Sequence, residues 1–174
     1  IYIHGQSDGV DVEVALQYND SFQENTPSYV NIINTHEGGS HLTGFKIALT
    51  KSIKDYAERK ELIKNKDDTI NGDDVREGLT AALSIKMGSK DLQFEGQTKG
   101  KLGNSEVQPI VAKIVREQLD TYFEEHPDTA KAIVGKALLT IQIRKAAKAA
   151  KDAIMRKGVF DSMGLPGKLA DCQS

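Results

Sequence analysis

The N-terminal part of the chain alternates apolar and polar residues, which is the period of a half-buried β-strand. Between residues 10 and 18 the even positions are apolar and most odd positions are polar. The polar stretch that follows contains Pro27 and is typical of a turn. Residues 29 to 33 then predict a second strand, which we expect to pair with the first as a hairpin. Residues 1 to 4 also look like the start of a strand.

A helix and a further strand follow in the pattern. Residues 44 to about 64 predict an amphipathic helix with a basic outer face, and its apolar positions are Phe45, Ala48, Leu49, Ile53 and Tyr56. A short helical turn begins at Asp73 and ends near Gly78. Residues 79 to 87 alternate again and predict a third strand, inside the sheet. A strand, a helix and another strand form a crossover unit, which is right-handed by default.

Two more helices are predicted in the C-terminal half. The first opens near Asn104 and ends before Pro127, and its apolar face comprises Val107, Ile110, Val111, Ile114, Leu119, Tyr122 and Phe123. Either Asp128 or Thr129 can cap the second helix, which should run from about residue 130 to 157. Such a helix is roughly 40 Å long, and a domain of this size cannot bury all of it. We therefore expect its second half to project.

Composition adds broad limits. The 174 residues, 39% hydrophobic and 28% charged, fit one globular domain with its own core. A net charge of -2 gives no overall attraction to nucleic acid, so any such surface must be local. The single cysteine, Cys172, cannot form an internal disulfide and suits a reducing cytoplasm. No apolar run approaches a membrane span, and the residues after Ile1 are no signal peptide; we expect a cytoplasmic piece of a longer chain.

Two histidines and a glutamate lie close together in the segment after the second predicted strand. His36, Glu37 and His41 are metal-ligating types, but their spacing matches no metal signature. We predict no metal site here. Gly38 and Gly39 instead indicate a tight strand-to-helix connection in which both residues take positive φ.

Residues 93 to 104 carry the most suggestive chemistry. They form a loop with three glycines, the amide of Gln97 and the amines of Lys99 and Lys101, directly before a helix. Glycines allow close backbone approach, helix N-termini favour anions, and lysine supplies a charge for phosphate. The segment lacks the spacing of the usual phosphate-binding loop. A solvated surface loop is the alternative from composition alone.

Several long motifs in this chain match one known family in order. Residues 94 to 104 read FEGQTKGKLGN, and residues 29 to 45 follow the pattern YVN-x-INT-x-EGG-x-H-x-x-GF. Residues 72 to 81 match GEDVREGLTA, and residues 165 to 172 read LPGKLADC. The chain therefore resembles, over nearly its whole length, the B subunits of bacterial type II DNA topoisomerases. This family comprises gyrase B and its topoisomerase IV counterpart.

The resemblance implies an α/β fold in two layers. In the family this region is the transducer domain, with a sheet of about four strands, a left-handed βαβ crossover in place of the right-handed default, and a long projecting C-terminal helix. Residues 1 to 158 would form that domain, with Gly158 ending the helix. Residues 159 to 174 would be a linker toward the metal-binding cleavage domain, which is absent from this sequence. Gly100 and Met155 depart from the residues usual in the family.

The family's QTK motif implies roles for three residues. Lys99 would be catalytic, and Gln97, Thr98 and Lys99 would bind ATP, with Gln97 and Lys99 on the γ-phosphate and Thr98 shaping the loop. We interpret Lys101 as a surface charge. ATP with Mg²⁺ would bind the full-length protein and no cofactor this segment alone, because it lacks an adenine pocket and a water-activating glutamate motif. The partners implied are the N-terminal ATPase domain, a second B subunit, the A subunit and duplex DNA.

The last predicted helix offers a second hypothesis. It carries Arg144, Lys145, Lys148 and Lys151 among small alanines, with Asp152 as their only acidic neighbour. This row is either a solvated surface or a DNA contact. In the second case the chain could be a stand-alone nucleic-acid-binding module, whose function would not depend on Lys99. A self-contained kinase-like enzyme is a weaker third hypothesis, since it would need its own nucleotide pocket.

Overall fold

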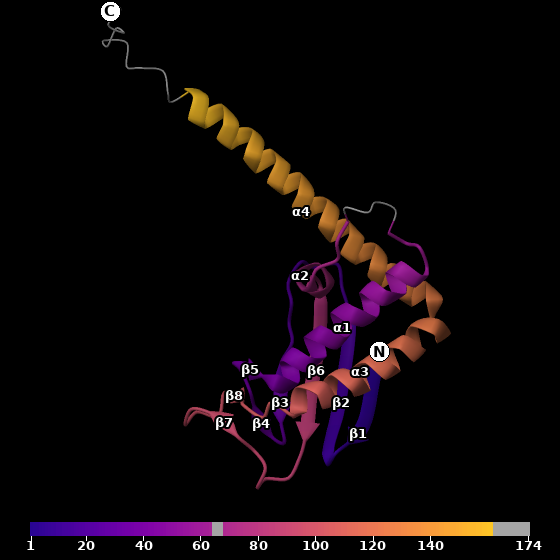
Figure 1. The fold of residues 1–174 in the computed structure, drawn as a ribbon, viewed down its shortest axis with the longest axis vertical. Helices are drawn as coiled ribbons and strands as arrows, with labels where there is room; N and C mark the ends of the chain where they lie inside the picture. Colours follow the sequence, from indigo (N-terminus) through magenta and orange to yellow (C-terminus); the bar gives the residue numbers. More distant parts are fainter. Residues whose placement is uncertain (64–67, 162–174) are drawn as a thin grey trace, which may run out of the picture.

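The computed structural model describes residues 1–63 and 68–161, with side chains described as far as Met155 (Figure 1). Its elements follow one another along the chain as β1 (Tyr2–Ser7), β2 (Val10–Tyr18), β3 (Ser28–Val30), β4 (Ile33–Asn34), β5 (Gly38–Gly39), α1 (Ser40–Arg59), α2 (Gly72–Arg76), β6 (Leu79–Lys86), β7 (Phe94–Glu95), β8 (Lys101–Leu102), α3 (Val107–Glu125) and α4 (Pro127–Asp161). In the described part of the chain, no helix is both long and apolar enough to cross a membrane.

The main sheet has five strands in the order β1-β2-β6-β3-β4. Val12 lies opposite Ile85 and Val14 opposite Leu83, and these side chains are buried on the face that α1 and α3 cover (Figure 1). The other face carries polar and small residues, and Ala82 there is exposed. The alternation seen in the sequence thus marks one buried face, and the predicted two-layer α/β fold is confirmed.

The pairing predicted for the second strand was wrong. β3 does not form a hairpin with β2, because β6 lies between them, antiparallel to β2 and parallel to β3. The segment joining β2 to β3 runs past the start of β6, where Asn25 forms a bridge with Thr80. β6 was predicted to lie inside the sheet, and it does. Its alternate residues Leu83 and Ile85 are fully buried.

The strand–helix–strand unit is present as β3, α1 and β6. In Figure 1, α1 lies in front of the sheet, β3 lies to the left of β6, and β6 points downward. Since β3 and β6 are parallel neighbours, this connection is left-handed. The expectation from the family resemblance therefore holds against the general rule.

The two C-terminal helices differ from the prediction at their ends. α4 begins at Pro127, whose fixed φ and missing N–H suit the first helical position, so neither Asp128 nor Thr129 is the cap. α4 also continues through Gly158 to Asp161, since one glycine inside a helix costs only about 1 kcal/mol. Ile141 is its last buried residue, and residues 142 to 155 are all exposed. The predicted projection is thus confirmed (Figure 1).

Candidate functional site

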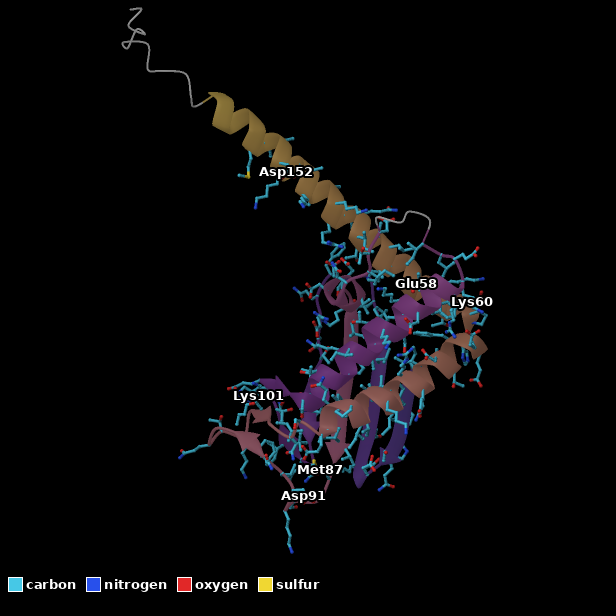
Figure 2. The ribbon with its side chains drawn as sticks, viewed as in Figure 1. Glu58, Lys60, Met87, Asp91, Lys101 and Asp152 are labelled. Carbon is cyan, nitrogen blue, oxygen red and sulfur yellow. The ribbon has the colours of Figure 1, made fainter. Side chains whose placement is uncertain are left out.

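The loop singled out in the sequence is a small hairpin. β7 and β8 pair antiparallel, with Glu95 opposite Lys101, and β8 also pairs parallel with β5. The result is a three-stranded sheet built from two-residue strands. Figure 2 shows Lys101 at the end of the molecule opposite the projecting part of α4, which carries Asp152. The sequence did not predict this hairpin, because two residues are too few to show alternation.

The tip of the hairpin presents three polar side chains to solvent. Gln97, Thr98 and Lys99 are all exposed, and within residues 1–63 and 68–155 none of them has a hydrogen-bond or ion-pair partner. Gly96 has φ 77° and Lys99 has φ 54°, so the turn uses two left-handed residues. A lysine in that region is uncommon. The turn therefore holds the Gln97 and Lys99 side chains outward, available to an external ligand.

The base of the hairpin is tied to the rest of the molecule. The Glu37 main-chain N–H donates to the Gly100 carbonyl at 2.9 Å, and β5 runs directly into α1. Lys101 Nζ donates to Glu95 Oε2 at 2.9 Å, and this bond raises the pKa of Lys101. Lys101 is thus engaged within the hairpin, which accords with its interpretation as a surface charge. A side chain at Gly100 would meet the ring of His36, with a Cβ at 2.7 Å from Cε1.

Asn104 connects the hairpin to the start of α3. Its buried side chain accepts the Gln93 N–H at 2.7 Å and donates to the Asp91 carbonyl at 2.7 Å. It also donates to Glu106 at 2.6 Å, and this bond lowers the pKa of the Glu106 carboxyl. Sequence reasoning assigned Asn104 only to the helix opening. A polar residue between a glycine and an apolar helical face was the available signal.

The glycines and histidines of the 36–41 segment have separate structural roles. Gly38 and Gly39 take positive φ of 78° and 136°, as predicted. His36 and Glu37 are exposed, whereas His41 is fully buried with Nε2 3.0 Å from Thr35 Oγ1. The two histidines therefore do not converge, and the described residues contain no cluster of three metal-ligating side chains.

Burial of His41 predicts a pH-dependent stability. Burial lowers the pKa of His41 from 6.5 to about 4. Below pH 6.5 the unfolded chain therefore binds a proton that the folded chain does not accept until about pH 4. Stability from this group is fully present above pH 6.5 and declines toward pH 4. We expect the free energy of unfolding of this chain to fall by about 2 kcal/mol from this group between roughly pH 7 and pH 5.

Urea unfolding at several pH values measures this effect. The variant His41→Gln removes the titrating group, so its stability should decline less steeply over the same pH interval. Identical slopes for the two proteins would show that His41 is not responsible.

The predicted DNA-contact residues do not form a single free row. Arg144 donates two hydrogen bonds to Asp74, and Lys145 Nζ lies 2.6 Å from Asp68 Oδ1. Lys148 and Lys151 are exposed, and no partner within the described side chains contacts them. Two of the four basic groups are therefore engaged with the body of the domain.

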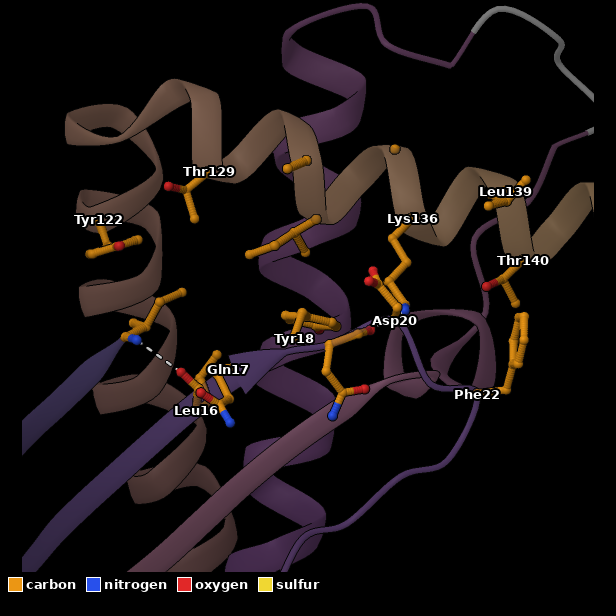
Figure 3. A pocket seen from close by; sticks show the side chains of 15 residues that line it. Leu16, Gln17, Tyr18, Asp20, Phe22, Tyr122, Thr129, Lys136, Leu139 and Thr140 are labelled. Atoms are coloured by element: carbon orange, nitrogen blue, oxygen red, sulfur yellow. Dashed lines mark hydrogen bonds between the residues drawn. The ribbon is translucent and has the colours of Figure 1, made fainter.

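A cavity of about 700 Å³ lies between α4, the end of α3 and the end of β2 (Figure 3). Its walls are mostly apolar and include Tyr18, Phe22 and Leu139. Lys136, also in the wall, donates its amine to two main-chain carbonyls. The cavity lies beside the start of β6, where Tyr18 pairs with Leu79, whereas the hairpin follows the end of β6. It therefore contributes nothing to the hairpin site.

Comparison with known proteins agrees with the motifs. The family model for DNA gyrase B matches residues 1–153. The chain belongs to the DNA gyrase B family. Among members of this family, the DNA gyrase B protein of Haloferax volcanii is 53% identical over 100% of this chain and 27% of its own length. The DNA gyrase B protein of Clostridium acetobutylicum is 51% identical with the same coverage. The chain thus spans about a quarter of the length of these curated gyrase B relatives.

Solved structures of gyrase B type show the same fold. The 43K ATPase domain of Thermus thermophilus gyrase B, in complex with an aminocoumarin, matches with a TM-score of 0.80 and 38% identity, covering 88% of this chain and 40% of that one. The ATP-binding domain of Francisella tularensis topoisomerase IV matches with a TM-score of 0.73 and 32% identity, covering 83% and 39%. Gyrase B and topoisomerase IV relatives therefore share this architecture.

Proposed function

We propose that this segment is the transducer domain of an ATP-dependent type II DNA topoisomerase B subunit, of the DNA gyrase kind. In this proposal its hairpin supplies Lys99 and Gln97 to the γ-phosphate of ATP bound by the ATPase domain of the same protein. The observation that carries the proposal is the hairpin tip, where Gln97, Thr98 and Lys99 project to solvent above an anchored base. Family membership supports it, because the same three residues match the family's QTK motif.

The chemistry of the tip fits a transferring phosphoryl group. ATP with Mg²⁺, bound in the neighbouring domain, would provide the phosphoryl group that is transferred to water. The Lys99 ammonium would stabilise the negative charge that spreads over the γ-oxygens in the transition state, without transferring a proton. The Gln97 amide would donate a hydrogen bond to the same oxygens. Thr98, between them, would keep the turn in the shape that directs both donors outward.

The anchoring of the hairpin supports a mechanical role. β8 is hydrogen-bonded to β5, which continues into α1, and α1 packs against α3 and α4. A hairpin tethered to the γ-phosphate and then released after hydrolysis would therefore change the position of the whole body relative to the ATPase domain. α4 would carry that change toward the A subunit and the duplex DNA, in a cytoplasmic assembly with a second B subunit.

The stand-alone nucleic-acid-binding alternative has less support from the geometry, because Arg144 and Lys145 are paired with Asp74 and Asp68. We expect the isolated chain to bind a DNA duplex only weakly, with Kd on the order of 10⁻⁴ M at physiological salt. Fluorescence anisotropy with a labelled duplex measures this. Tight binding that falls steeply with salt and weakens in Lys148→Ala/Lys151→Ala would favour the alternative.

The experiment that tests the proposed function is ATP hydrolysis by the full-length protein carrying Lys99→Ala. The matched control is Lys101→Ala, since Lys101 lies two residues away on the same hairpin but is paired with Glu95. A large loss for the first and a small change for the second support the proposal. Equal turnover in the native protein and Lys99→Ala would reject it. The segment alone should not hydrolyse ATP at all.

A further inference from the structure

The root of α4 is held by acidic residues of the segment that precedes β6. Ile141 is the last fully buried residue of α4, and the three acidic residues contact the turn around and just beyond it. The contacts are Glu77 with Thr140, at 3.0 Å, Asp74 with Arg144, at 2.9 and 3.0 Å, and Asp68 with Lys145, at 2.6 Å. From residue 146 to residue 155 all side chains are exposed. The helix therefore becomes free of the body at this turn.

The Asp74–Arg144 pair is the most constrained of these contacts. The Asp74 side chain is 1% exposed, and both of its oxygens accept from the guanidinium group of Arg144. One oxygen also accepts the main-chain N–H of Asn71 at 2.9 Å, which caps α2. A bidentate carboxylate–guanidinium pair fixes orientation as well as distance, because both groups are planar. The pair thus joins α4 rigidly to α2.

The central strand connects this pair to the hairpin. α2 ends at Arg76, β6 begins at Leu79, and the chain leaves β6 at Lys86 and reaches β7 at Phe94. The pair and the hairpin therefore lie at opposite ends of the strand that occupies the middle of the sheet. A movement of the hairpin that carries the sheet with it would arrive at α4 through this pair.

We propose that Asp74 and Arg144 are positioning residues that fix the direction in which α4 leaves the domain and so pass the movement of the domain to the projecting helix. This inference rests on the proposed transducer function and assigns a place where the movement is transmitted. It also reassigns Arg144 from DNA contact to an internal joint. The variant Arg144→Gln breaks the bidentate contact while keeping one possible donor toward Asp74.

The direction of α4 can be measured without any enzymatic activity. Spin labels at Glu58→Cys on α1 and Asp152→Cys on α4, both exposed positions, report the distance across the joint in a Cys172→Ser background (Figure 2). We expect Arg144→Gln to widen the distance distribution about twofold or more. Arg144→Lys should give an intermediate width, because it keeps the charge and loses the fork. Lys131→Gln, which removes an exposed charge elsewhere on α4, should match the unsubstituted protein.

Activity of the full-length protein separates transmission from chemistry. Arg144→Gln should lower the number of strand-passage events per ATP hydrolysed about tenfold while ATP turnover stays within about twofold. An unchanged distance distribution, or an unchanged ratio of strand passage to hydrolysis, would overturn the inference. Failure of the proposed function itself would be seen separately, as normal ATP turnover in Lys99→Ala. The distance measurement remains decisive for the joint in either case.

Discussion

Replacing Lys99 by alanine lowers kcat for ATP hydrolysis by the full-length protein about a hundredfold or more, the scale of one lost oxyanion-type donor. The Lys99 amine is exposed at the hairpin tip with no partner among the described residues, so the substitution removes no contact that holds the fold together. Charge on the γ-oxygens is greatest in the transition state, and the loss should therefore fall on kcat more than on nucleotide affinity. Steady-state kinetics and a direct nucleotide-binding assay measure the two quantities.

Neighbouring substitutions set the specificity of that result. Gln97→Ala should lower kcat by a smaller factor, about tenfold, because it removes a neutral donor. Lys101→Ala should stay close to the native rate, since its ammonium is already paired with Glu95. Equal losses for Lys99→Ala and Lys101→Ala would mean that the whole hairpin had been disturbed. In that case the special role of Lys99 would be lost.

Replacing Gly39 by alanine destabilises the domain by about 3 kcal/mol and detaches the hairpin from it. Gly39 has φ 136°, a region that residues with a side chain rarely adopt. A Cβ there would lie 2.5 Å from the main-chain nitrogen and oxygen of Leu102, neither of which can rotate away. β5 and β8 would have to separate, and the hairpin would lose its anchor. Urea unfolding measures the first effect, and ATP turnover of the full-length protein should fall even though Gly39 touches no ligand.

A glycine elsewhere provides the matched control. Gly135 lies within α4, is exposed, and has nothing within 4 Å of the position a Cβ would take. Gly135→Ala should therefore stabilise the chain by roughly 0.5–1 kcal/mol, because alanine loses less backbone entropy in a helix. Opposite signs for the two substitutions are expected. Equal small effects would show that the close approach of β5 and β8 is not needed.

The periodic elements were predicted well because their period is a local property. Alternation marked β2 and β6, and helical spacing marked α1 and α3, whose predicted apolar residues such as Phe45 and Leu119 are buried. The pairing of β3 failed because a strand pattern shows which face is buried and not which strand lies next to it. The ends of α4 failed because a proline can begin a helix and a single glycine need not end one.

The candidate site divides in the same way. Gln97 and Lys99 were found from a linear motif, and the structure places them together at one exposed tip. Asn104 and the β5–β8 contact could not be found, because each depends on segments far apart in the chain coming together. Arg144 looked like a DNA contact because the helix around it is basic, and Asp74 is 70 residues away.

The sequence by itself determined the family, the order of the main helices and strands, and the residues at the hairpin tip, since motif and period are written in consecutive residues. Only the tertiary structure decided that β6 separates β2 from β3, that β5 anchors the hairpin, and that Arg144 faces Asp74. These features depend on which distant segments share the core and on where a buried carboxylate finds its counter-charge. That choice is made by the packing and desolvation of the whole domain.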